Sequence, residues 1–140
     1  TQDYFPPSPS VYMGMSGSDV DLEGGVIAAQ TATIQAGYVA ESGATLVEFA
    51  TAEETISAVQ NGEADAVLAD GDYLASIIAE SGGEFANVGE VSIGGGVGMG
   101  IRESDGDLKA TMDKAISSMK EDGSLNALIK KWFGNDANTF

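Results

Sequence analysis

Residues 26–70 read VIAAQTATIQAGYVAESGATLVEFATAEETISAVQNGEADAVLAD, and this stretch decides the fold. Three short apolar runs, 26–29, 45–49 and 66–69, alternate with segments of helical spacing. Short apolar runs are typical of strands that are buried on both faces of a parallel sheet. Their alternation with helices predicts an α/β fold, in which helices cover a parallel sheet.

The helices between these strands carry start and stop signals. The first is predicted from Thr33 to a stop at Gly43, and its spaced apolar residues are Ile34, Tyr38 and Val39. The second opens on a Thr-x-x-Glu capping box, Thr51 to Glu54, and Asn61-Gly62 ends it. A third follows residue 70, with Leu74, Ile77 and Ile78 on one face and a stop at 81–83.

The flanks of this core extend the pattern. Pro6, Pro7 and Pro9 exclude a helix and predict an extended connector that leads into a strand at 11–15. Further strands are predicted at 88–93 and 97–101. Two amphipathic helices then follow, with the apolar stripes Leu108, Met112, Ala115, Ile116, Met119 and Leu125, Leu128, Ile129, Trp132, Phe133.

Composition excludes several kinds of chemistry. The chain has no Cys and no His, so disulfides, thiolate or imidazole metal sites and Ser-His-Asp triads are excluded. No apolar run approaches the ~20 residues of a membrane span. The net charge of −16 makes nucleic acid a poor partner. The glycine run at 94–100 has neither GxxxxGK[ST] nor GxGxxG spacing, so we expect no nucleotide and no other cofactor.

The charge is divided unevenly along the chain. Residues 1–101 hold 15 carboxylates and no cation, whereas residues 102–140 hold 7 carboxylates and all 6 basic residues. This change suggests two structural neighbourhoods that join near residue 101, although an acidic surface adapted to salt would also produce such a charge. In either case the first 101 residues cannot offer a cation to a bound carboxylate.

Two loops follow predicted strands at their carboxyl ends, where open α/β sheets bind ligands. Gln30, Thr31 and Thr33 lie in the first loop, which opens a helix, and helix N-termini bind carboxylates. Asp70 and Asp72 lie in the second loop, where a carboxylate suits an ammonium group. Together the two loops suit a zwitterion. In each loop the alternative is that the polar residue only caps its helix.

Three stretches, in order, resemble the amino-acid-binding family of periplasmic solute-binding proteins, which includes the histidine and lysine-arginine-ornithine binders. They are DLEGGVIAAQTAT (21–33), ISAVQNGEADAVLAD (56–70) and GVGMGIRESDGDLKATMDKAISSMKEDGSLNALIKKWFG (96–134). The family pattern places Ser/Gln-Gly-Thr where this chain has Thr31-Ala32-Thr33. Ala32 therefore replaces a usual glycine, which restricts the backbone at that turn.

The resemblance implies one Rossmann-like lobe of a type II periplasmic binding protein, together with C-terminal helices of the other lobe. We expect a first inter-lobe connector at 1–10, ligand-binding lobe 2 at 11–95 and a second connector strand at 96–101. Lobe 1 helices are expected at 102–134 and a flexible tail at 135–140. It further implies that most of lobe 1, with the arginine that binds the ligand carboxylate, would precede Thr1.

Site residues follow from the same resemblance. Thr33 is expected to donate to the ligand carboxylate, Asp70 to accept from the α-ammonium, and Thr31 and Gln30 to line the pocket. The implied function is non-enzymatic: capture of a polar amino acid for an ABC permease in the inner membrane. The protein would be periplasmic, or extracellular and lipid-anchored in a Gram-positive organism.

Three alternatives remain open at this point. The same fold hosts dehydratases of the aromatic amino-acid pathway, so an enzyme is one rival. A ligand-sensing domain is another. Finally, surfaces left open by the absent lobe predict a homodimer.

Overall fold

A computed structural model describes all residues, 1–140, and the chain divides into two compact units. The sheet unit comprises residues 9–93, and the helical unit comprises residues 1–8 and 94–140. No helix of either unit has both the length and the apolar character that a membrane span requires.

The sheet unit is built on five strands: β2 (Ser10–Met15), β3 (Val26–Gln30), β4 (Thr45–Phe49), β5 (Ala66–Asp70) and β6 (Phe85–Val91). Their order in the sheet is β4-β3-β5-β2-β6. β3 runs parallel to β4 and β5, but β2 is antiparallel to β5 and β6. The parallel arrangement predicted for the strands of residues 26–70 is confirmed, and the antiparallel β2 makes the whole sheet mixed. Segment 16–25, which joins β2 to β3, contains no helix, and β5 lies between these two strands in the sheet.

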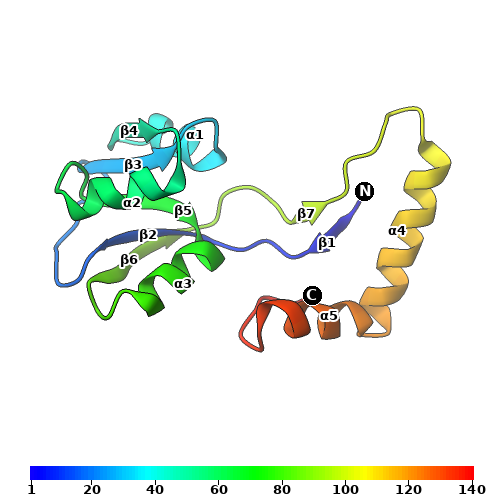
Figure 1. Ribbon diagram of the computed structural model, residues 1–140. Coiled ribbons are helices and arrows are strands. Elements are labelled where there is room, and N and C mark those ends of the chain that lie inside the picture. Colours follow the sequence, from blue (N-terminus) through cyan, green and yellow to red (C-terminus); the bar gives the residue numbers. More distant parts are fainter. The chain divides into compact units, whose positions relative to one another are not determined.

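Three helices cover this sheet, one on one face and two on the other (Figure 1). α1 (Ile34–Glu41) places Val39 among the buried residues of one face. α2 (Ala52–Gln60) and α3 (Gly71–Glu80) place Val59 and Leu74 among those of the other face. The alternation of strand and helix over residues 26–80 is confirmed.

The capping box of α2 is present in both halves, as predicted. The Glu54 N–H donates to Thr51 Oγ1 at 3.2 Å, and the Thr51 N–H donates to Glu54 Oε2 at 3.0 Å. These bonds satisfy two backbone donors that the first helical turn would otherwise leave without acceptors. They fix where α2 starts at the end of β4.

The predicted apolar face of α1 was right for Val39, which is buried, but wrong for Ile34 and Tyr38. Ile34 is 59% exposed and Tyr38 is 38% exposed. The residues that α1 buries are Gln35, Ala36 and Val39. The helix turns this face inward because the Gln35 amide hydrogen-bonds to groups of β2 and β5. α1 also ends before the predicted glycine, with Ser42 as its C-cap.

The helical unit contains β1 (Asp3–Phe5), β7 (Val97–Gly98), α4 (Gly106–Glu121) and α5 (Ser124–Phe133). β1 and β7 form a two-stranded antiparallel sheet. Of the strand predicted at 97–101, only the two residues of β7 form a strand. The strand predicted at 88–93 corresponds to β6, which starts earlier, at Phe85. Glycines at 94–96, 98 and 100 weaken strand structure around β7, because glycine offers no side chain to pack.

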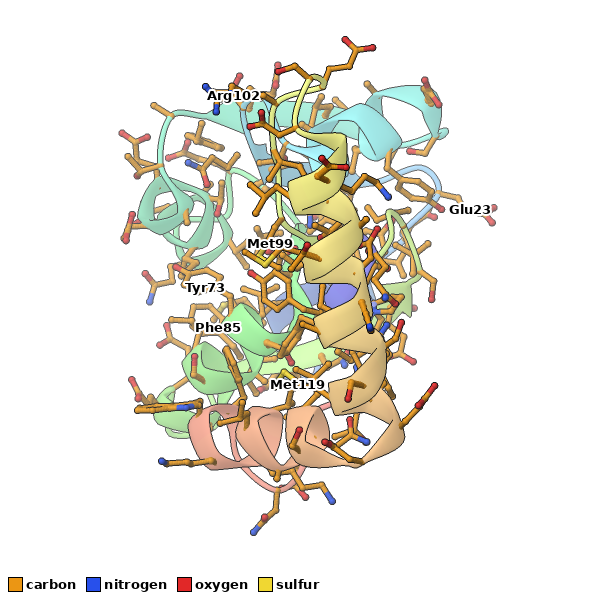
Figure 2. The ribbon with its side chains drawn as sticks, turned by 90° about the vertical axis from the view of Figure 1, so that its right-hand side faces the viewer. Glu23, Tyr73, Phe85, Met99, Arg102 and Met119 are labelled. Atoms are coloured by element: carbon orange, nitrogen blue, oxygen red, sulfur yellow. The ribbon has the colours of Figure 1, made fainter.

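The two helices of the helical unit pack through a small core. Ile116, Leu125 and Ile129 are buried there, with Met99 and Met119 against them. Figure 2 shows Met119 where α4 meets α5. Other residues of the predicted stripes face outward, among them Trp132, which is 72% exposed, and Phe133, which is 64% exposed.

The first residues of the chain are bonded to α4. The Gln2 N–H donates to Asp113 Oδ1 at 2.7 Å, and Lys109 Nζ donates to Asp113 Oδ2 at 2.6 Å. The Lys109 hydrogen bond, followed by that of the Gln2 N–H, lowers the pKa of Asp113 below its usual value. These bonds help to hold residues 1–8 and 94–140 in one unit although the sequence separates them.

Candidate functional site

A cavity of about 310 Å³ lies in the sheet unit, at the carboxyl ends of β3 and β5. α1, α2 and α3 all begin at this edge of the sheet, because each follows a strand that ends there. The residues that line the cavity come from these strand ends and helix starts: Gln30, Thr33, Gln35, Ala52, Thr55, Leu68, Ala69, Asp70 and Tyr73. The cavity is therefore where a ligand-binding site is expected in an open α/β sheet.

Asp70 is the one charged residue of the lining. It ends β5 and is the N-cap residue of α3, but its side chain makes no capping hydrogen bond. Its carboxylate Oδ1 instead accepts from Gln35 Nε2 at 2.6 Å. The alternative interpretation, in which the Asp70 side chain only caps its helix, is therefore wrong.

The backbone on either side of Asp70 is held by β2. Ser10 is its partner across the strands, and the Gly71 N–H donates to the Pro9 carbonyl at 3.0 Å. Gly71 has no room for a side chain, since a Cβ atom there would lie 2.6 Å from the Pro9 carbonyl oxygen. Only glycine permits this close approach.

Thr33 is the N-cap of α1, and its hydroxyl both accepts and donates a hydrogen bond within the protein. Thr33 Oγ1 accepts from the Ala36 N–H at 3.1 Å and donates its hydrogen to the Gln30 carbonyl at 2.7 Å. A hydroxyl has one hydrogen to donate, so this hydrogen is already used within the protein. The N–H groups of Ile34 and Gln35 have no acceptor in the protein. They are the free donors at this helix start.

Ala32 lies in the turn before α1 with φ 60°, in the left-handed region. Left-handed backbone costs a non-glycine residue roughly 1–2 kcal/mol. Ala32 therefore adopts a backbone conformation that glycine takes more readily. It keeps that turn under strain.

The other two predicted residues differ in position. Gln30 lines the cavity, and its Nε2 donates to the Ala50 carbonyl at 3.1 Å. Thr31 is exposed and is not part of the lining, although its N–H donates to the Phe49 carbonyl at 2.9 Å. The fold thus brings Gln30, Thr33 and Asp70 together and leaves Thr31 beside them.

Sequence reasoning missed three polar residues of the lining: Gln35, Thr55 and Tyr73. Gln35 and Thr55 are buried, at 5% and 2% exposure. The available signal was position, since all three residues lie in the first turn of a helix that starts at this edge. Periodicity alone favoured the apolar residues of those helices.

The electrostatics of the site combine two opposite charges. The helix starts bring partial positive charge and free N–H groups, whereas Asp70 brings a full negative charge. The sheet unit as a whole contains 14 carboxylates and no Lys or Arg. No group of three or more Asp and Glu residues has a geometry that suits a metal ion. The arrangement suits an organic ligand with an ammonium group and a carboxylate.

Known proteins are similar to this chain in sequence and in fold. The sequence pattern of the bacterial extracellular solute-binding proteins, family 3, matches residues 3–135. A periplasmic His/Glu/Gln/Arg/opine family-binding protein from Silicibacter pomeroyi, solved in complex with lysine, is 67% identical with a TM-score of 0.87. That match covers 100% of this chain and 64% of the other chain.

Two proteins of Escherichia coli (strain K12) are more distant relatives. The L-cystine-binding protein TcyJ is 33% identical over 75 residues, which are 54% of this chain and 28% of that protein. The lysine/arginine/ornithine-binding periplasmic protein is 30% identical over 99 residues, which are 65% of this chain and 38% of that protein. The chain spans less than two thirds of each of these three proteins.

The fold and the site define a class of protein, a type II periplasmic binding protein, of which this chain represents one part. Within that class, the chain belongs to family 3 of the bacterial extracellular solute-binding proteins. The predicted resemblance to the amino-acid-binding family is confirmed, and so is the predicted α/β fold. These three relatives are named as binding proteins and not as enzymes.

Proposed function

We propose that this chain carries one half of the ligand site of a solute-binding protein that captures a polar amino acid for an ABC transporter. The observation that carries the proposal is the cavity in which the Asp70 carboxylate lies beside the start of α1. Asp70 accepts from the α-ammonium of the ligand. The free N–H groups of Ile34 and Gln35 donate to its α-carboxylate.

Three further residues complete this half of the site. Thr33 holds the first turn of α1 in place through its cap, so that the free N–H groups are presented together. Gln30 lines the cavity, and Thr31 stands at its edge. An arginine for the ligand carboxylate has to come from outside the sheet unit, because that unit has no cation.

Lysine is the first ligand to test. The relative that is 67% identical was solved with lysine bound. The 14 carboxylates of the sheet unit also attract a cationic ligand and repel an acidic one. Both observations favour a basic amino acid among the polar ones.

Titration of the chain with lysine and with glutamate, in the full length that its gene encodes, tests the proposal. Calorimetry is expected to show saturable lysine binding without turnover, and much weaker binding of glutamate. The 140-residue chain alone is expected to bind only weakly, since half of the site is absent. A micromolar dissociation constant for this chain as a verified monomer would contradict the two-lobe arrangement.

The proposed setting is transport. Relatives of this chain are periplasmic proteins, which supports a periplasmic location, or an extracellular, lipid-anchored one. The partner would be an ABC permease in the inner membrane, to which the bound amino acid is delivered by closure and opening of the two lobes.

We also propose that the protein is not an enzyme. The chain has no His and no Cys, and Asp70 is the one carboxylate that lines the cavity. A dehydratase would convert its ligand, whereas a binder returns it unchanged. Incubation with lysine or with a cyclohexadienyl acid, followed by mass spectrometry of the small molecules, distinguishes the two.

Self-association through the helical unit is part of this proposal. Leu128, Trp132 and Phe133 of α5 expose apolar surface, and both edges of the β1–β7 pair are free. Such surfaces favour association, here with a second copy of the chain.

Thr33→Val is expected to act on both folding and binding. Loss of the cap should lower the free energy of unfolding by about 1 kcal/mol. Lysine affinity should fall by a factor of roughly 5 to 30, or 1–2 kcal/mol, because the N–H groups remain but are held less firmly. Urea denaturation and calorimetry measure the two effects. Thr51→Val, which removes the cap of α2, is the matched control, and lysine affinity that falls equally in both variants would assign Thr33 a structural role only.

A further inference from the structure

Gln35 is the buried polar residue of α1 and lies beside Asp70. It is 5% exposed. Its Nε2 donates to Asp70 Oδ1 at 2.6 Å and to Ser10 Oγ at 3.1 Å. Both hydrogens of the amide nitrogen are therefore used, one on β5 and the other on β2.

These two bonds fix the orientation of the amide. An ionised carboxylate can only accept hydrogen bonds. If the amide were turned over, Gln35 Oε1 would face Asp70 Oδ1 at a hydrogen-bond distance, with two acceptors and no hydrogen between them. The position of the amide oxygen is thus determined by its neighbours.

The amide oxygen has no donor within the protein. No hydrogen bond of the structure ends on Gln35 Oε1, whereas Nε2 takes part in two. No fully enclosed side-chain oxygen or nitrogen lacks a partner anywhere in the chain. Gln35 Oε1 is therefore accessible, and Gln35 lines the cavity. An oriented acceptor on a buried side chain normally meets a donor.

We propose that Gln35 is a ligand-binding residue, whose Oε1 accepts one hydrogen of the ligand's α-ammonium while Asp70 accepts another. This inference rests on the proposed function. A primary ammonium has three hydrogens and can bond to both acceptors at once. A ligand without the α-ammonium offers neither acceptor a donor from this group, so the site should prefer a ligand that carries one.

Two ligands test this role: lysine, and 6-aminohexanoic acid, which is lysine without its α-amino group. Both are titrated into the wild type and Gln35→Met, in the full length that the gene encodes. The wild type should prefer lysine. Gln35→Met should lower lysine affinity roughly tenfold or more and change 6-aminohexanoic acid affinity by less than about threefold. Equal losses for both ligands would overturn the inference.

A second background separates direct contact from an effect through Asp70. In Asp70→Asn, Asn Oδ1 still accepts from Gln35 Nε2, so the amide keeps its orientation. If Gln35 touches the ligand, adding Gln35→Met should reduce lysine affinity further in this background, by about fivefold or more. No further loss would show that Gln35 only positions Asp70, and would overturn the direct contact.

Controls separate this inference from failure of the protein or of the proposed function. Gln60→Met replaces an exposed glutamine of α2 outside the cavity and should leave both affinities unchanged. If Gln35→Met does not fold in urea-denaturation measurements, Gln35→Asn draws the oxygen back from the cavity and should show the same selective loss. A wild type that does not bind lysine contradicts the proposed function. If the wild type prefers lysine and both Gln35 variants keep that preference in full, only the role of Gln35 is contradicted.

Discussion

Asp70→Ala is expected to weaken lysine binding by about 2 kcal/mol or more, a loss of roughly thirtyfold in affinity. The variant removes the charged acceptor for the ligand ammonium. It also leaves one hydrogen of the Gln35 amide without its acceptor at 2.6 Å. Because Asp70 makes no capping bond to α3, any loss of stability should come from the Gln35 amide and not from the helix start.

Asp72→Ala provides the matched control for this change. Asp72 lies two residues further along, in the first turn of α3, and does not line the cavity. It has the same charge, so it contributes equally to long-range attraction of a cationic ligand. Calorimetry on both variants compares the two carboxylates. Affinity that is unchanged in Asp70→Ala, or equally reduced in Asp72→Ala, would remove Asp70 from the site.

Self-association of the chain is expected to strengthen with salt and to depend on α5. At low salt the net charge of −16 opposes association. In 0.5 M salt the screening length falls to about 4 Å. Burial of a large apolar side chain then contributes about 1.5–3 kcal/mol, and Trp132 and Phe133 are the most exposed of these residues. A dimer is therefore expected at high protein concentration.

Light scattering on the chain and on a double variant, Trp132→Ser with Phe133→Ser, measures this effect. The double variant should remain a monomer where the wild type dimerises. Ile34→Ser, which removes a 59% exposed apolar side chain from the sheet unit, should dimerise like the wild type. A wild type that stays monomeric in 0.5 M salt would contradict the proposed homodimer.

Local signals in the sequence predicted the elements well. The capping box of Thr51 and Glu54 fixes the start of α2 through its own two hydrogen bonds, so it can be recognised without any tertiary information. The short apolar runs predicted β3, β4 and β5, although β4 lies at the edge of the sheet and none of its residues is buried. Asp70 and Gln30 followed from the rule that ligands bind where such strands end.

Features that depend on distant partners could not be predicted. The direction of β2 depends on its pairing with β5 and β6, which lie far from it in the sequence. The inward face of α1 depends on Gln35 meeting Ser10 and Asp70, which are 25 and 35 residues away in the sequence. The hydroxyl of Thr33 points its hydrogen at the Gln30 carbonyl, and no spacing rule anticipates that choice. Polar contacts between separate elements thus decided the details of the site.

Two hydrogen bonds and one strand pairing join the start of the sheet unit to its cavity. The Pro9 carbonyl accepts from Gly71, Ser10 is paired with Asp70 along the sheet, and Ser10 Oγ accepts from Gln35. Residues 9 and 10 directly follow Ser8, the last residue of the helical unit's first segment. A force on the chain at Ser8 is therefore transmitted through Pro9 alone to the Gly71 N–H, which follows Asp70. The Asp70 side of the cavity is thus tied directly to one of the two chain segments that join the sheet unit to the helical unit.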